Sequence, residues 1–130
     1  MTGTAHQRKP GHRGLAHVAM AMLYSGRGLA AAWRHEEAFR LELLVAALLV
    51  PAGLWLGRTG VEYALLFGAL VMVLLVELVN SAVEAVVDRI GTDDNPLSGR
   101  AKDLGSAAVF ASLVLVAVIW GAVAWGRFLA

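Results

Sequence analysis

The strongest constraint on this chain is an uninterrupted apolar segment near its C-terminus. Residues 104–126, LGSAAVFASLVLVAVIWGAVAWG, contain no charged side chain. As an α-helix, a segment of this length rises about 34 Å, enough to cross the hydrocarbon core of a bilayer, which is about 30 Å thick. Two further apolar segments lie at 43–57 and 61–87, and the first becomes long enough when the interfacial residues 37–42 are included. The sequence therefore predicts an all-α membrane protein with three transmembrane helices.

The composition agrees with a membrane location. Hydrophobic residues make up 58% of the chain, against about 45–50% in soluble domains, and charged residues make up 16%, against about 25%. The 130 residues have room for one domain. The chain has no cysteine, which excludes disulfides, thiolate metal sites and a cysteine nucleophile. The net charge of +1 gives no indication of nucleic-acid binding, and we expect no nucleic-acid partner.

The distribution of lysine and arginine predicts the orientation in the membrane. The basic residues before the first span and between the second and third spans are Arg8, Lys9, Arg13, Arg27, Arg34, Arg40, Arg89, Arg100 and Lys102. The other side of the membrane holds only Arg58 and Arg127. Because cytoplasmic loops carry the excess of positive charge, we expect a cytoplasmic N-terminus, a cytoplasmic 88–103 connection and an external C-terminus.

The chain divides into a short tail and one membrane domain. Residues 1–13 are predicted to be a flexible basic tail, and residues 14–130 the domain. Between 14 and 33 apolar residues recur at helical spacing, which indicates an amphipathic helix on the cytoplasmic surface, with a plain tail as the alternative. Ser98 is expected to cap the third span. The three spans are expected at about 37–57, 62–90 and 100–128.

Four polar residues follow the apolar part of the second span, in the segment VELVNSAVEAVVDRIG (76–91). At 100° per residue they share one stripe about 80° wide, which we call the acidic face. Its members are Glu77, Asn80, Glu84 and Asp88. Ionisable groups at membrane depth are costly and usually face the protein interior or a water-filled cavity. A structural alternative is a hydrogen bond between subunits or an ion pair with another helix.

The chemistry of the acidic face indicates phosphoryl transfer. Oxygen ligands with no histidine or cysteine nearby suit Mg²⁺, which takes one or two carboxylates together with substrate phosphates. Glu77 is the deepest of the four residues, and a carboxylate shielded from water makes a useful general base. Phosphoryl transfer needs mainly such positioning and charge neutralisation.

Two other segments complement the acidic face. SGRAKDLGS (98–106) offers Arg100 and Lys102 as phosphate partners at a helix N-terminus, and the absence of GxxxxGK[ST] excludes a P-loop. WRHEEAFRLE (33–42) contains interfacial anchors but also three glutamates, which a negatively charged leaflet does not favour. A metal ion that recruits one of these glutamates would account for them.

Three segments resemble the signatures of the prokaryotic integral-membrane diacylglycerol kinases. They are GLAAAWRHEEAFRLE, VELVNSAVEAVVDRIG and LSGRAKDLGSAAV, and the resemblance covers about residues 14–128. It implies a homotrimer of three-span subunits, each with a surface helix, in the bacterial inner membrane. It also implies transfer of the γ-phosphate of MgATP to diacylglycerol, giving phosphatidic acid, so that diacylglycerol, ATP, Mg²⁺ and membrane lipids are the expected partners.

The resemblance also implies roles for individual residues. Glu77 would be the catalytic base that contacts the lipid hydroxyl, and Glu36 and Glu84 would coordinate magnesium. The residues implied to contact or support the nucleotide are Tyr24, Asn80, Asp88, Asp93, Asp94, Asn95, Lys102 and Asp103. The residues implied to border the lipid path are Ala38, Arg40, Glu42, Trp55, Ser106, Trp120 and Trp125. The sequence departs from the family pattern at His17, Met20 and Gly26 and in the TDDNP loop.

Two alternatives remain open at the level of sequence. One is an undecaprenol kinase, since relatives of this fold phosphorylate that lipid alcohol. The other is a subunit of a small oligomeric channel or transporter that uses the acidic face as an ion pathway. A transporter needs a polar line across the whole membrane, and the apolar outer half of the second span, YALLFGALVMVLL, argues against it.

Overall fold

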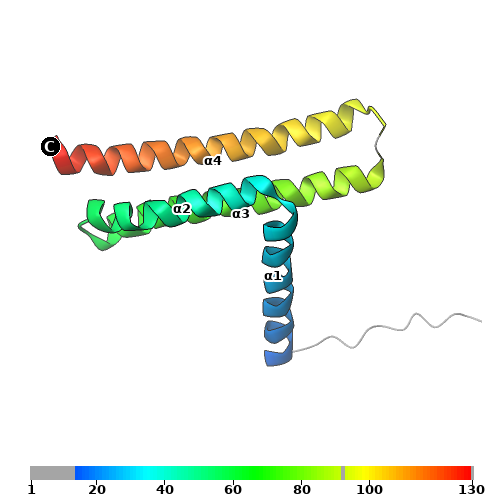
Figure 1. The fold of residues 1–130 in the computed structure, drawn as a ribbon, viewed down its shortest axis with the longest axis horizontal. Helices are drawn as coiled ribbons and strands as arrows, with labels where there is room; N and C mark the ends of the chain where they lie inside the picture. Colours follow the sequence, from blue (N-terminus) through cyan, green and yellow to red (C-terminus); the bar gives the residue numbers. More distant parts are fainter. Residues whose placement is uncertain (1–13, 92, 130) are drawn as a thin grey trace, which may run out of the picture. The chain divides into compact units, whose positions relative to one another are not determined.

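The protein is entirely helical in the part of the chain that the computed structural model describes, residues 14–91 and 93–129. The helices are α1 (Leu15–His35), α2 (Glu37–Leu56), α3 (Gly60–Ile90) and α4 (Pro96–Phe128) (Figure 1). The all-α prediction is therefore confirmed for these residues. The predicted tail at 1–13 lies outside them.

Three of the helices, α2, α3 and α4, are long and apolar enough to cross a membrane, as the sequence predicts. They contain 20, 31 and 33 residues. At 1.5 Å per residue α3 and α4 measure about 46 and 50 Å, so both extend beyond a hydrocarbon core of about 30 Å. The ends of these two helices can therefore carry polar side chains into the interface.

The N-terminal helix α1 forms where a surface helix was predicted. Its residues up to Ala31 belong to a compact unit distinct from residues 32–130. Leu15, Met22 and Leu29 of α1 are exposed. Attachment of α1 to the membrane surface stays a prediction.

Local capping explains where α3 and α4 begin. The Thr59 side chain accepts a hydrogen bond from Glu62 N (3.2 Å), and the Glu62 carboxylate accepts from Thr59 N (3.0 Å), which is a capping box. The N-cap of α4 is Asn95, not Ser98 as expected: Asn95 Oδ1 accepts from Leu97 N (2.9 Å) and Ser98 N (3.4 Å). Pro96 follows at the first helical position, where its fixed φ suits a helix start, so α4 begins earlier than expected.

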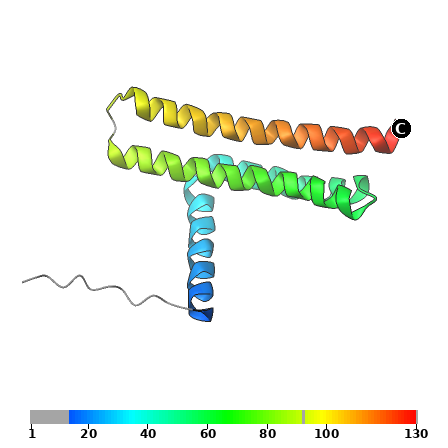
Figure 2. The ribbon, with the colours of Figure 1, turned by 180° about the vertical axis from the view of Figure 1, so that it is seen from behind.

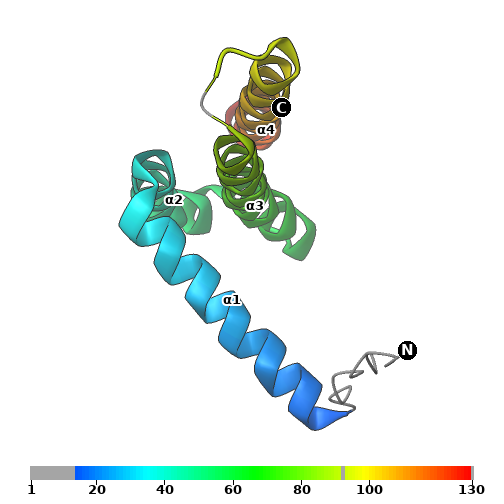
Figure 3. The same cartoon turned by 90° about the vertical axis from the view of Figure 1, so that its right-hand side faces the viewer.

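Among the three long helices, α3 is central. It contacts both α2 and α4, whereas α2 and α4 touch at few positions (Figures 2 and 3). Its buried side chains include Leu66, Leu70 and Val73, and α4 buries only Ser112. Most large apolar side chains of α2 and α4 face outward, which suits a lipid environment and would be costly in water.

Aromatic and basic side chains join the helices at the end where α2 meets α3. Trp120 Nε1 donates a hydrogen bond to Leu66 O (3.3 Å). Arg127 Nη1 donates to Leu56 O (3.5 Å) at the C-terminus of α2, and its guanidinium lies 5.2 Å from the centre of the Trp55 ring. These contacts hold the end of the bundle opposite to the acidic face.

Candidate active site

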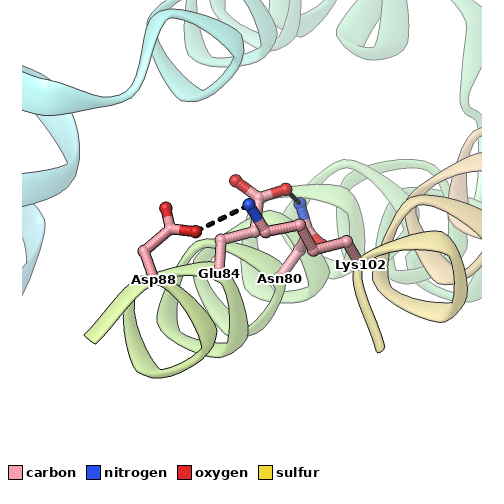
Figure 4. Close-up of polar contacts among 4 residues, drawn as sticks. All are labelled: Asn80, Glu84, Asp88 and Lys102. Carbon is pink, nitrogen blue, oxygen red and sulfur yellow. Dashed lines mark hydrogen bonds and ion pairs between the residues drawn. The ribbon is translucent and has the colours of Figure 1, made fainter. Parts of the chain in front are cut away.

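The acidic face lies on the half of α3 that leads to the 91–95 loop. Because α3 is unbroken, its members at spacings of three and four residues lie along one side. Glu77 is 4% exposed, and Asn80 and Glu84 are partly buried. Asn80 Nδ2 donates a hydrogen bond to Glu84 Oε1 (3.2 Å), which orients that carboxylate (Figure 4). The predicted grouping of these side chains is thus present in the structure.

The start of α4 adds a cation to this face. Lys102 Nζ lies 2.6 Å from Asp88 Oδ1, and the two side chains come from opposite sides of the 91–95 loop (Figure 4). Lys102 also lies close enough to Glu84 for their charges to interact. The sequence analysis assigned Lys102 to the nucleotide and did not pair it with Asp88. That pairing depends on the register between α3 and α4, which the sequence does not reveal.

The Asn80 side chain of α3 packs closely against Gly105 of α4. A Cβ atom added to Gly105 would collide with Asn80 Oδ1. This oxygen is buried and has no hydrogen-bond partner among the described residues. Glycine is therefore required at this position if Asn80 is to keep its hydrogen bond to Glu84.

Negative charge concentrates around Glu77. The carboxylates of Glu36, Glu42 and Glu84 all lie close enough for their charges to act on that of Glu77. Glu36 is at the N-cap of α2, but its side chain makes no capping hydrogen bond, so its carboxylate remains available. Two helices, α2 with its N-cap residue and α3, therefore direct acidic groups to one region.

The metal-ligand prediction receives only indirect support. In the described part of the chain, no three His, Cys, Asp or Glu side chains converge closely enough to hold a metal ion by themselves. Mg²⁺ commonly takes only one or two carboxylates and completes its shell with phosphates and water. The oxygen-only donors Glu36 and Glu84 fit such a site.

An apolar cavity of about 300 Å³ lies between the three long helices, and the nearest of its lining residues to Glu77 along α3 is Val73. Its lining residues come from α2, α3 and α4, and they include Ala38, Glu42, Leu70 and Val73. Val73 precedes Glu77 by one helical turn. Glu42 Oε2 is buried without a hydrogen-bond partner in the described residues, so a polar group faces an otherwise apolar surface. Such a cavity suits a ligand with an apolar body and a hydroxyl group.

The other residues with predicted roles are more dispersed. Asp93 and Asp94 are exposed in the loop before α4, where Asn95 serves as the N-cap. Asp103 and Ser106 are exposed on α4.

Tyr24 belongs to the unit that ends at Ala31, where the Arg27 guanidinium lies 6.0 Å from its ring centre. Trp120 hydrogen-bonds to Leu66, eleven residues before Glu77, or about 16 Å along α3. Trp55 lies nearer the opposite end of the bundle, in contact with Arg127.

Comparison with known proteins identifies the family. The model of the prokaryotic diacylglycerol kinases matches residues 23–124. The chain is 47% identical over 110 residues to the diacylglycerol kinase of Haemophilus influenzae, covering 85% of this chain and 93% of that protein. The chain belongs to the prokaryotic diacylglycerol kinase family.

Other relatives in this family agree. The Escherichia coli diacylglycerol kinase is 43% identical over 115 residues, covering 88% of this chain and 94% of the relative. The Pseudomonas aeruginosa diacylglycerol kinase is 41% identical over 116 residues, covering 89% and 94%. The resemblance inferred from three short segments is confirmed, and this prokaryotic diacylglycerol kinase is a lipid kinase.

Sequence reasoning missed two structural features of this kinase. Leu70 and Val73 line the cavity, but they look like ordinary apolar residues of a span. Arg40 Nη1 donates hydrogen bonds to two backbone carbonyls at the end of α1. The sequence analysis assigned Arg40 to the lipid path, and it did not predict this contact across the break between α1 and α2 at Glu36.

Proposed function

We propose that this kinase transfers the γ-phosphate of MgATP to the hydroxyl of diacylglycerol, giving phosphatidic acid, at the cytoplasmic interface of the bacterial inner membrane. The observation that carries the proposal is the burial of Glu77 on α3, one helical turn from Val73 of the apolar cavity and at the start of the polar half of the helix. A water-soluble nucleotide can meet a membrane-held alcohol only at such a boundary. The N-terminus would be cytoplasmic and the C-terminus external.

In the proposed reaction Glu77 takes the proton of the lipid hydroxyl while the hydroxyl oxygen forms a bond to the γ-phosphorus. The bond from the γ-phosphorus to the oxygen that bridges the β-phosphate breaks, and ADP leaves with that oxygen. Glu77 suits this role because it is a buried carboxylate one helical turn beyond Val73, which lines the cavity. A positioned general base typically contributes about 10²–10⁴-fold to the rate.

Glu36 and Glu84 would hold the magnesium ion of MgATP. Both are partly buried carboxylates near Glu77, the Glu36 carboxylate is not used as a cap, and Asn80 orients that of Glu84. When bound, Mg²⁺ supplies positive charge to the phosphates.

Residues of α4 and of the loop before it would bind the nucleotide. Lys102 would exchange Asp88 for a phosphate, and Asp103 lies beside it in the sequence. Tyr24, Asp93, Asp94 and Asn95 are further candidates, with Asn95 limited to contacts compatible with its capping role.

The lipid would enter through the apolar cavity. Ala38 and Glu42 line it, which supports their assignment to the lipid path, and Glu42 offers an acceptor for a second polar group of the lipid. Arg40 and Ser106 would border the path nearer the loop end. Trp55, Trp120 and Trp125 would contact the distal parts of acyl chains.

The kinase is proposed to act as a homotrimer. A single chain leaves wide apolar faces on α2, α3 and α4 and covers the acidic face only in part. Neighbouring subunits would complete that cover, because ionisable groups at membrane depth are costly when exposed to lipid.

The substrate assignment is tested by offering the purified protein labelled ATP with diacylglycerol and with undecaprenol in parallel. We expect magnesium-dependent label transfer to diacylglycerol, with little transfer to undecaprenol. Preferential labelling of undecaprenol would show that diacylglycerol is not the preferred substrate, although the assignment as a lipid kinase would stand. The channel alternative lacks support, since the buried residues of α3 before Glu77 are all apolar.

A further inference from the structure

The chain is interrupted between α1 and α2 at a residue of the proposed metal site. Glu36 has φ −107° and ψ 109°, an extended conformation between two helices. Its N–H still bonds to Ala32 O (2.9 Å), and its carbonyl accepts from Arg40 N (3.3 Å). The direction of the Glu36 carboxylate therefore depends on how this helix break is held.

The helix break leaves backbone carbonyls without their helical partners. In a continuous helix, the carbonyls of Trp33 and Arg34 would accept from the N–H groups four residues later. Because α1 ends at His35, those donors belong to the first turn of α2 instead. The last carbonyls of a helix need other donors and favour a cation.

Arg40 supplies these donors. Its Nη1 lies 3.0 Å from Trp33 O and 3.4 Å from Arg34 O. The same residue bonds through its backbone N–H to Glu36 O. Arg40 thus joins both sides of the helix break, with its backbone in α2 and its side chain on the end of α1.

We infer that Arg40 is a positioning residue for Glu36. By binding the last carbonyls of α1 it fixes the extended conformation of Glu36 and so directs the carboxylate toward Glu77 and Glu84. The inference rests on the proposed role of Glu36 in holding magnesium. It gives Arg40 a task in addition to its proposed place beside the lipid path, because its Nη1 is engaged with two carbonyls at the end of α1.

The variant Arg40→Gln tests this inference. Loss of a group that orients a metal ligand typically lowers metal affinity about 10–100-fold, so we expect the magnesium concentration for half-maximal rate to rise at least about 10-fold. Turnover at saturating magnesium should change much less. Arg40→Lys keeps the charge and one donor nitrogen but not the planar guanidinium. Its magnesium concentration for half-maximal rate should lie between those of the wild type and Arg40→Gln.

Arg34→Gln is the matched control. It removes a neighbouring cation from the same interface but keeps the Arg34 carbonyl that Arg40 contacts. If Arg40 acted only as a surface charge, Arg34→Gln and Arg40→Gln would have similar effects. We expect the magnesium dependence of Arg34→Gln to equal that of the wild type.

A second measurement does not depend on activity. Hydrogen exchange of the metal-free protein in nanodiscs should be faster at residues 33–38 in Arg40→Gln and unchanged in Arg34→Gln. Unchanged exchange in Arg40→Gln would overturn the inference.

The response of Glu36→Ala separates this inference from the proposed function. If Glu36→Ala shifts the magnesium dependence and Arg40→Gln does not, the inference is wrong and the metal site stands. If Glu36→Ala has no effect on it, the proposed metal site fails, and the positioning role fails with it.

Discussion

At the scale of single residues, the acidic face combines two kinds of charged group. Asp88 and Lys102 have side chains 63% and 43% exposed, so solvent screens their ion pair and it contributes little to stability. Lys102 can therefore change partner at little cost, as a phosphate-binding residue must. Glu77 is 4% exposed in a membrane helix, where a carboxylate is costly to the fold. Its presence is best explained by chemistry.

Glu77→Gln should abolish most of the turnover. Glutamine has nearly the same volume, so the packing around α3 should persist, but it cannot accept the hydroxyl proton. We expect the rate of label transfer from ATP to diacylglycerol to fall about 10²–10⁴-fold, with unchanged size in detergent. Glu62→Gln, at the other end of α3, is the control, because glutamine can replace glutamate in a capping box. Near-normal turnover of a folded Glu77→Gln protein would exclude the base assignment.

At the scale of helices, the sequence predicts what local rules determine. Apolar length identifies the spans, and helical spacing places Glu77, Asn80 and Glu84 on one side. At the start of α4 both Asn95 and Ser98 are residue types that can cap a helix. Asn95 is the N-cap because Pro96 follows it at the first helical position, where its fixed φ suits a helix start. The sequence could not reveal the Asp88–Lys102 pair, because this contact depends on how far α4 is shifted along α3.

Gly105→Ala tests the close approach of α3 and α4. The added methyl group would occupy the position of Asn80 Oδ1, so the Asn80 side chain must rotate away and release Glu84. We expect the protein to assemble but its turnover to fall about 10-fold or more, since small displacements in a site are costly. In Gly121→Ala, on the same helix, the new Cβ atom meets nothing within 4 Å, and turnover should be unchanged. Equal activities of the two variants would show that this contact does not position the site.

At the scale of the whole molecule, one chain supplies the parts of the site but not its cover. Glu36, Glu77, Glu84 and Lys102 all come from one unit of the chain. Asp103, however, is exposed on α4, and its side chain forms no hydrogen bond or salt bridge within residues 14–91 and 93–129. In the proposed homotrimer, Asp103, which is proposed to bind the nucleotide, is free to serve the Glu77 of a neighbouring subunit.

Mixed trimers test whether the site is shared. Subunits with only Glu77→Gln and subunits with only Asp103→Asn are each expected to be inactive alone. If a site takes Glu77 from one subunit and Asp103 from its neighbour in a closed ring, random exchange at equal amounts restores about a quarter of the sites. If both residues belong to one chain, no mixture regains activity.

The double variant provides the complementary measurement. Wild-type subunits mixed equally with subunits carrying both Glu77→Gln and Asp103→Asn should retain about a quarter of the sites if they are shared and about half if they are not. Tag pull-down verifies the exchange of subunits in each mixture. The two experiments must agree. If the first mixture is inactive and the second retains about half of the activity, each site belongs to a single chain, and the neighbouring subunits only shield the acidic face from lipid.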